Sequence, residues 1–383
     1  MSAPACRVCG SDHLESFENR LPGVTSDAKP YPRGSGSLCI CWGCGLVQKP
    51  DRPEWRTRAQ RVYDQYDIYH QSDGTEQQLF TSSRAESRSE RILGNLKGRL
   101  ELPPDGRLLD VGCGNGSLLR VASRLLPRWQ LAGYDLDDRH EDDVPGDFSS
   151  GDISDICDRF DIITLSHVLE HIPEPVPFLK TLSGLLTPGG VIVAQVPDLD
   201  ANPFDLMVVD HASHFTLETL DGTLARAGLA TTILDSGWVP KELTAVVRPE
   251  PSVTSFVHYE TEDGQRVEGA LTWLRHVADE AQELATTRYR FAVFGTSIAG
   301  VWLYGALHVA GVTITSGDDW IRPSLCDEAL RLGRILAELA PNDGFYNYHL
   351  AIFYRDTGKN TEALKHARRA AELRPETSAY QQL

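Results

Sequence analysis

A glycine-rich segment carries the residues best suited to hold a small charged ligand. Residues 107–111 form a short apolar run that includes Asp110, and glycines follow at 112, 114 and 116 before an apolar-periodic segment from Ser117. Glycine tolerates positive φ and leaves no Cβ between the main chain and a ligand. The free N–H groups of the next helix's first turn would face that ligand. The segment predicts a strand, a tight turn and a helix around a binding site.

The spacing of this segment narrows the ligand. An aspartate followed by G-x-G-x-G is neither the phosphate loop G-x-x-x-x-G-K-[ST] nor the dinucleotide turn G-x-G-x-x-G. A carboxylate at Asp110 suits a cationic or amine-bearing ligand better than a pyrophosphate. From this segment alone, a purely structural turn or another nucleotide-binding fold remains open.

Two C-x-x-C pairs near the N-terminus have the spacing of a metal site. Each pair is followed by a glycine, which permits the tight turn that aims backbone N–H groups at the sulfurs; the pairs are Cys6 with Cys9 and Cys41 with Cys44. Four thiolates around one ion predict a structural Zn²⁺ site without an open position. Cys39 could be a rival ligand, and disulfides or free thiols are the alternatives. No secretory signal supports disulfides.

Histidines beside carboxylates are the candidate acid–base groups. His211 and His214 follow the strand expected over 191–196, which is the fifth predicted strand, and Asp210 could orient the imidazole of His211. Histidine titrates near neutral pH and can accept a proton from a substrate. His171 is a further candidate, and Tyr66 belongs to a tyrosine stripe that could line a cleft. These side chains could equally bind backbone, cap a helix or pack in the core.

The elements that must position these residues alternate between strands and helices. A second strand ends at Asp135, whose carboxylate suits two ribose hydroxyls, and Gly151 and Asp152 follow a shortened connection. An apolar run over 161–166 ends at Ser166 and reads as a central parallel strand, and another strand is expected over 191–196. This order predicts an α/β doubly wound parallel sheet.

The motifs in this order resemble the class I S-adenosylmethionine-dependent methyltransferases over residues 85–248. The matching pieces are D-x-G-x-G-x-G, an acidic strand end, G-D-I, V-L-E-H and L-x-P-G-G. The resemblance implies S-adenosylmethionine as cofactor, with Asp152 meeting the adenine amino group and the main chain of Ile153 meeting the ring. The implied cofactor-binding set is Asp110, Gly112, Gly114, Gly116, Asp135, Asp152, Ile153 and Ser166.

Together with the cysteine pairs, the chain is similar to the sugar C-methyltransferases, which act on keto-deoxysugars attached to a nucleoside diphosphate. That resemblance implies that Tyr66 or Tyr69 and the Asp210–His211 pair deprotonate the carbon next to the ketone. Aspartate stands here where the family has glutamate, which puts the reach of the base in doubt. His171 matches another histidine of the family. Methylation at oxygen or nitrogen of a small molecule or glycan remains an alternative.

The C-terminal third departs from those relatives. Residues 290–302 again predict a strand, a glycine turn and a helix, but lack the lysine that the relatives usually carry there. Glu328 and Glu362 begin matching segments 34 residues apart, which resemble about one and a half tetratricopeptide repeats. So few units must dock on this chain, on a protein partner or in a homodimer. We expect parts at 1–53 (zinc-binding module), 54–250 (methyltransferase domain), 251–322 (small Rossmann-like domain) and 323–383 (helical repeat).

The charge and hydropathy of the chain limit the kinds of partner that we expect it to bind. The formal net charge of −17 should repel nucleic acid, which disfavours the alternative of an RNA methyltransferase. No apolar run of membrane-spanning length and no signal peptide is evident, so we expect no membrane partner and a cytoplasmic protein. The remaining alternative, a degenerate methyltransferase serving as a binding scaffold, conflicts with the intact glycine turn.

Overall fold

The computed structural model describes residues 5–66, 76, 78–80, 85–136, 144–250, 252, 261–286, 298–309, 365, 368 and 369. The chain divides into two compact units, 1–77 with 88–314 and 78–87 with 315–383. In the second unit, strands β6 (Gln78–Phe80) and β7 (Ala85–Ser87) form an antiparallel pair. Everything described below belongs to the first unit.

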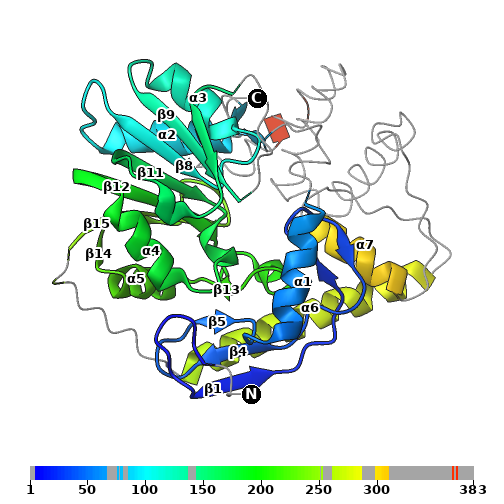
Figure 1. Cartoon of the computed structure of the whole chain (residues 1–383). Helices are drawn as coiled ribbons and strands as arrows, with labels where there is room; N and C mark the ends of the chain where they lie inside the picture. The colour runs from blue at the N-terminus through cyan, green and yellow to red at the C-terminus, as the bar shows by residue number, and fades with distance from the viewer. Residues whose placement is uncertain are drawn as a thin grey trace. The chain divides into compact units, whose positions relative to one another are not determined.

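A seven-stranded sheet is the centre of the first unit (Figure 1). Its strands are ordered β10-β9-β8-β11-β12-β15-β14, and all neighbours are parallel except those of β15. Their bounds are β8 (Arg107–Val111), β9 (Gln130–Asp135), β10 (Asp147–Ser150), β11 (Phe160–Ser166), β12 (Leu186–Pro197), β14 (Leu229–Asp235) and β15 (Glu242–Pro249). The parallel-rich α/β sheet confirms the predicted class, and the prediction did not contain the antiparallel β15, which lies between β12 and the edge strand β14.

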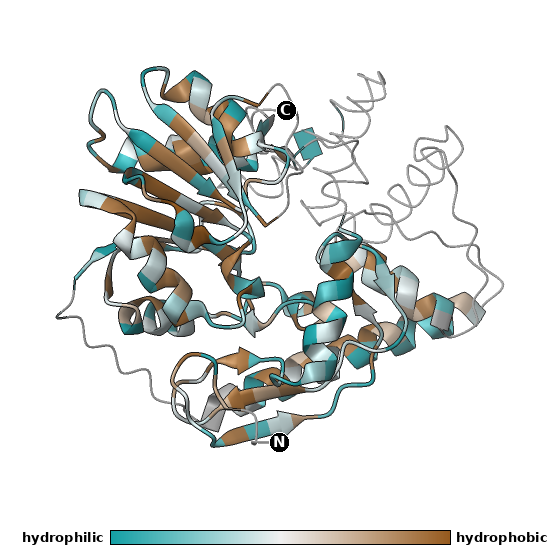
Figure 2. Cartoon of the chain, viewed as in Figure 1, coloured by the Kyte–Doolittle hydropathy of each residue, from teal (hydrophilic) through white to brown (hydrophobic). Residues whose placement is uncertain are grey.

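Helices connect the strands and cover their apolar residues. Figure 2 shows hydrophobic residues concentrated along the central strands. The helices are α2 (Arg88–Arg99), α3 (Ser117–Leu125), α4 (Pro175–Gly184) and α5 (Leu217–Arg226), and α2 packs on α3 while α4 packs on α5. The chain runs outward from β8 to β10 and then crosses back to β11, so right-handed crossovers place α3 and α4 on opposite faces. The carboxyl ends of β8 and β11 therefore form the switch point where such sheets bind ligands.

The N-terminal module contributes a smaller sheet with the order β1-β4-β5-β13. Strands β1 (Leu14–Phe17), β4 (Leu38–Cys41) and β5 (Val47–Gln48) come from the module, and β13 (Ser213–His214) comes from the segment after the fifth predicted strand. A short pair of β2 (Gly23–Val24) with β3 (Pro30–Tyr31) and helix α1 (Pro53–Asp64) complete it. The smaller sheet thus includes one strand, β13, from the segment that follows β12 of the large sheet.

Helices α6 (Thr261–Thr286) and α7 (Ile298–Val309) pack on this module. The indole of Trp302 is fully buried and donates a hydrogen bond to the carbonyl of Pro22 at 2.9 Å. The strand and glycine turn predicted over 290–297, and almost all of the predicted repeat, lie outside the described residues. The boundaries of those parts stay predictions. Among the described residues, no helix is long and apolar enough to cross a membrane.

Candidate active site

The glycine turn has the backbone that its sequence predicts. Gly112, Gly114 and Gly116 have φ of 73°, 51° and 78°, which is the region that favours glycine. A Cβ on Gly112 would lie 2.4 Å from Val168 Cγ2, and one on Gly116 would lie 2.2 Å from Val144 Cγ1. Gly112 and Gly116 are therefore required for two reasons: the positive φ of the turn, and the lack of space for a Cβ beside Val168 and Val144.

Asp110 lies beneath this turn, in the sheet. Its side chain is buried and accepts a hydrogen bond from Thr164 Oγ1 at 2.7 Å, which ties β8 to β11. Burial raises the pKa of Asp110 to about 7. The visible role of this carboxyl is to hold the two central strands together, and its predicted contact with a ligand remains a prediction.

Asp135 ends β9 beside the turn, and the half-buried side chain fits the predicted ribose contact. Oδ2 accepts the N–H of Gly114 at 2.9 Å, and Oδ1 accepts the N–H of Leu136 at 2.8 Å. These bonds hold the carboxylate in place, and two oxygens with about four acceptor positions keep capacity for two hydroxyls. These acceptor atoms therefore suit the ribose hydroxyls of S-adenosylmethionine.

The remaining predicted cofactor residues also lie at the carboxyl edge of the large sheet. Asp152 is fully exposed and caps the turn η2 (Ile153–Asp155) by accepting the N–H of Ser154 at 2.9 Å, which lowers its pKa. Ile153 is buried. Ser166 ends β11 and donates to Gln195 Oε1 at 3.2 Å. The structure thus brings the eight predicted cofactor residues to the carboxyl ends of four adjacent strands, β10, β9, β8 and β11.

The four paired cysteines converge in the N-terminal module. The Sγ atoms of Cys6 and Cys44 are 3.5 Å apart, those of Cys9 and Cys41 are 3.4 Å apart, and all four lie within 4.8 Å of one another. A tetrahedral Zn²⁺ with bonds of about 2.3 Å separates its sulfurs by about 3.8 Å. Gly10 and Gly45, one after each pair, have φ of 74° and 72°. The cluster fits zinc.

Cys39 stands apart from that cluster. Its thiol lies 3.5 Å from the carbonyl oxygen of Gln48 and is not among the grouped thiols. The geometry therefore gives no support to Cys39 as a rival ligand.

A carboxylate shared by two imidazoles is the centre of the histidine cluster. Asp205, on the short helix η4 (Pro203–Met207), lies 2.7 Å from Nδ1 of His211 and 2.6 Å from Nδ1 of His214. Burial works against an imidazolium at His211, but the attraction of Asp205 outweighs it and raises the pKa of His211. For His214 burial prevails and lowers the pKa. Asp205 thus orients His211 through Nδ1.

Asp210 was expected in that orienting role, and the structure places it elsewhere. Its carboxylate accepts the N–H and the hydroxyl of Ser26, a residue of the N-terminal module. Its Oδ2 lies 3.5 Å from Nδ1 of His171. The two neighbours in sequence, Asp210 and His211, therefore point to different partners.

His171 and the tyrosine stripe face the same cluster. The ring of His171 lies 4.6 Å from that of His211 and 5.8 Å from that of Tyr63, centroid to centroid. Burial, reinforced by the nearby His211, lowers the pKa of His171. Tyr66 follows α1 with its ring 6.5 Å from that of Tyr63, whereas Tyr69 lies outside the described residues. The ring that touches the histidines is thus Tyr63, one helical turn before the predicted Tyr66.

Sequence reasoning missed a buried charge network beside this cluster. His167, directly after β11 with φ of 55°, lies 3.1 Å from both Glu170 Oε1 and Glu242 Oε1, and Arg88 lies 2.9 Å from Glu242. Burial disfavours the imidazolium, but Glu242 and Glu170 outweigh it and raise the pKa of His167 to about 9. The i, i+3 spacing of His167 and Glu170 was a visible signal, whereas Glu242 comes from a distant strand.

The N-terminal module holds the segment that carries the cluster. The amino group of Lys49 is fully buried and donates to the carbonyls of Ser35 at 3.0 Å and Leu206 at 2.8 Å. Burial lowers the pKa of Lys49 to about 7. Trp55 donates to the carbonyl of Val209 at 3.0 Å, and β13 pairs with β5. Both ends of the segment are therefore fixed from the module.

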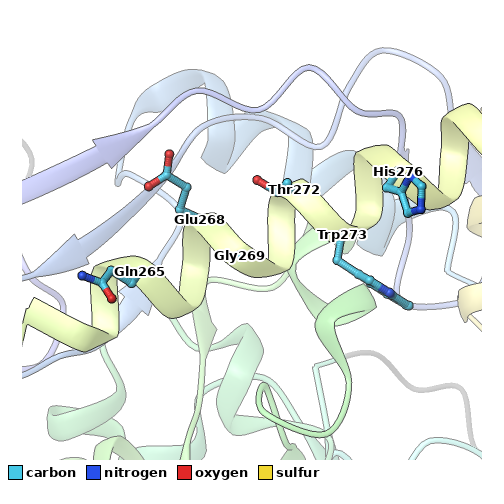
Figure 3. Close-up of a pocket in the computed structure, with 6 residues that line it drawn as sticks. All are labelled: Gln265, Glu268, Gly269, Thr272, Trp273 and His276. Carbon is cyan, nitrogen blue, oxygen red and sulfur yellow. The ribbon is translucent and has the colours of Figure 1, made fainter.

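A hollow of about 660 Å³ lies elsewhere, on α6 (Figure 3). Its lining is Gln265, Glu268, Gly269, Thr272, Trp273 and His276. None of these is a predicted site residue, so we place the candidate active site at the edge of the large sheet.

Comparison with known protein families agrees with that placement. Residues 84–233 match a family described as "Methyltransferase domain". The chain therefore contains a methyltransferase domain, and the match covers the glycine turn, Asp135, Asp152 and His167. It does not reach the cysteine cluster.

Curated relatives also match part of the chain. The ubiquinone biosynthesis O-methyltransferase of Xanthomonas campestris pv. campestris (strain B100) is 31% identical over 119 residues, which are 28% of this chain and 49% of that protein. The protein of that name from Bordetella bronchiseptica is 26% identical over 168 residues, or 40% of this chain and 62% of the relative. The chain thus spans about half the length of the curated relatives it matches.

Two solved structures match part of the chain. CalO1, a methyltransferase in calicheamicin biosynthesis, is 21% identical with a TM-score of 0.36 and covers 42% of this chain and 54% of its own. An S-adenosylmethionine-dependent methyltransferase from Clostridium acetobutylicum ATCC 824 is 15% identical with a TM-score of 0.37. The match covers 51% of this chain and 99% of that chain. At these TM-scores the likeness says nothing about activity.

Proposed function

We propose that this protein is an S-adenosylmethionine-dependent methyltransferase that acts on a small molecule. The observation that carries the proposal is that two groups lie at the same edge of the large sheet. One is the fixed carboxylate of Asp135, the proposed ribose acceptor, and the other is the buried His211–Asp205 pair. The first group suits the cofactor, and the second suits removal of a proton from an acceptor. The match of residues 84–233 to a methyltransferase domain supports this assignment.

The cofactor would be held by the turn and by Asp135, with Asp152 and Ile153 at the adenine end. S-adenosylmethionine supplies a methyl group on a sulfonium, a good leaving group. The protein must therefore align donor and acceptor and take up the acceptor's proton where one is lost. His211 presents Nε2 for that task because its Nδ1 is occupied by Asp205.

The acceptor that we propose is a sugar, probed first as a keto-sugar linked to a nucleotide and methylated at carbon. Support comes from the four-cysteine module before the methyltransferase domain and from the ring of Tyr63 against His171. A carbon next to a ketone loses its proton more readily than other carbons, and the buried His211 can take it. The acceptor end of the site also receives Ser26 from the module.

Methylation of a hydroxyl is the second candidate. It is favoured by the curated relatives, which are named as O-methyltransferases. The two candidates differ in what happens before transfer, because only C-methylation requires loss of a carbon-bound proton.

The test combines proton exchange with transfer. Protein is incubated in deuterated water with a panel of keto-sugar nucleotides, without cofactor, and then with S-adenosylmethionine labelled in its methyl group. Deuterium uptake next to the ketone followed by label on carbon supports C-methylation, and label on oxygen without exchange supports the second candidate. Absence of any label, together with no heat of cofactor binding, overturns the proposal.

A variant of the base sharpens the test. His211→Asn should keep cofactor affinity and lose turnover by roughly 10²–10⁴-fold, the usual contribution of a positioned base. His276→Asn, an exposed histidine on α6, is the matched control and should retain turnover. Turnover close to wild type in His211→Asn would remove His211 from the reaction.

A structural zinc ion belongs to the same proposal. Cys6, Cys9, Cys41 and Cys44 would bind it with no open position, so it would stabilise the module and take no part in the reaction.

A further inference from the structure

A second set of metal-ligating side chains lies inside the candidate active site. One ligand atom from each of Glu170, His171 and His211 lies within 4.8 Å of the other two. Glu170 and His171 belong to η3 (Leu169–His171), which follows β11, and His211 comes from the segment held by the N-terminal module. Two imidazoles and one carboxylate are the donor set with which proteins hold first-row divalent metals while leaving positions open.

Two polar atoms of this set are buried and make no hydrogen bond, although Asp210 Oδ2 lies 3.5 Å from one of them, Nδ1 of His171. Glu170 is fully buried, and its Oε2 has no hydrogen bond although Oε1 lies 3.1 Å from His167. Nδ1 of His171 is likewise buried without a hydrogen-bond partner. An unsatisfied buried carboxylate oxygen costs free energy, and a bound cation would remove that cost.

The neighbouring Asp205 also orients His211, the third ligand of this set. Because Asp205 occupies Nδ1 of His211, the nitrogen that remains is Nε2, which is the arrangement in which a carboxylate orients a metal-binding imidazole. The neighbouring set of Asp205, His211 and His214 is a weaker candidate, because its carboxylate oxygens and Nδ1 atoms already pair at 2.7 and 2.6 Å.

We propose that Glu170, His171 and His211 bind one first-row divalent metal ion. With three protein ligands, the ion would keep positions for water or for an oxygen atom of the acceptor. A cation on Nε2 of His211 replaces proton abstraction by that nitrogen with polarisation of the acceptor oxygen. Metal occupancy would then decide which of these two roles His211 plays. This site is separate from the four-cysteine cluster, whose sulfurs lie in the N-terminal module.

The test uses Mn²⁺, because carboxylate and imidazole ligands accept this ion and a four-thiolate site disfavours it. Full-length protein is treated with chelator until one zinc per chain remains, and free Mn²⁺ is followed by electron paramagnetic resonance during titration. We expect one Mn²⁺ per chain in the wild type. Glu170→Gln and His171→Asn should each weaken binding at least tenfold, since each removes a ligand. Glu174→Gln and His276→Asn, which change exposed residues of the same types, should bind like the wild type.

Each result of the Mn²⁺ titration either supports or overturns the inference. No Mn²⁺ binding by the wild type at millimolar concentration overturns the inference, as does unchanged binding in both ligand variants. Because Glu170 also pairs with His167, a thermal melt with and without Mn²⁺ on the wild type provides a second measurement that needs no variant. A rise in melting temperature supports the site, and no rise overturns it. None of these readouts involves turnover, so they stand or fall independently of the proposed methyl transfer.

Discussion

The glycine turn and the segment 203–214 lie at the same edge of the large sheet, yet they are built in different ways. The turn at 112–116 is shaped by its own glycines, and its main outside partner, Asp135, comes from the adjacent strand. The segment 203–214 is held from outside, by Lys49, Trp55 and Ser26 and by the pairing of β13 with β5. In the proposed site, the cofactor half is thus local, and the acceptor half is assembled across the chain.

This difference has a functional consequence. A turn that carries its own geometry can hold the same cofactor in many proteins, whatever else the chain contains. An acceptor half that depends on an N-terminal module can be changed through that module without disturbing the cofactor. The cysteine cluster, which shares its sheet with His214, is therefore part of how the acceptor half is positioned.

The largest expected effect comes from breaking the cysteine cluster. Structural zinc contributes about 10–16 kcal/mol of binding free energy in small domains, so Cys41→Ser should cost several kcal/mol of unfolding free energy and release zinc. Denaturant unfolding and metal content measure both effects. Cys39→Ser, two residues away on β4 and outside the cluster, is the matched control and should keep its zinc. If Cys41→Ser kept zinc and stability, the acceptor half would not depend on the cluster.

A second, smaller effect concerns His167, where the two halves meet. Its pKa rises from 6.5 to about 9 on folding, because Glu242 and Glu170 outweigh the burial that opposes the charge. The stabilisation, roughly 3 kcal/mol, is complete below pH 6.5 and is lost as the pH rises through 9. Asparagine tolerates the positive φ of this position, so His167→Asn is the suitable variant.

The measurement is the difference in unfolding free energy between wild type and His167→Asn as a function of pH. Lys49 titrates in the opposite sense, because burial lowers its pKa to about 7, but it is present in both proteins and cancels. We expect the difference to shrink between pH 6.5 and 9.5. A constant difference would show that the imidazole is not charged in the folded protein.

The same contrast explains which parts could be predicted from sequence. The parallel sheet, the turn and the four-cysteine cluster rest on short-range patterns, namely alternation, glycine spacing and C-x-x-C pairs. The partner of His211 could not be found in this way, because Asp205 reaches it across a turn while the adjacent Asp210 binds Ser26 instead. Lys49 gave no signal, since a lysine buried against distant carbonyls looks like any surface lysine in a sequence.

Asp135→Ala tests the local half. The charged acceptor of the ribose hydroxyls is lost, so cofactor binding should weaken by about 1–3 kcal/mol, while the fold of the segment 203–214 is untouched. Calorimetry with S-adenosylmethionine measures the affinity. Asp105→Ala changes an exposed aspartate before β8 and should bind like the wild type. Equal affinities in all three proteins would place the ribose elsewhere.

Ser26→Ala tests the assembled half with the smallest change. Its hydroxyl donates to the fully buried carboxylate of Asp210, and removing one charge-assisted hydrogen bond should cost about 1–2 kcal/mol of unfolding free energy. The backbone N–H of residue 26 still donates to the same carboxylate, so the protein should fold. Ser26→Thr keeps a hydroxyl and should restore most of the stability. Cofactor affinity should be equal in all three proteins, because Asp135 and the turn do not depend on the module. A drop in cofactor affinity in Ser26→Ala would mean that the two halves are coupled.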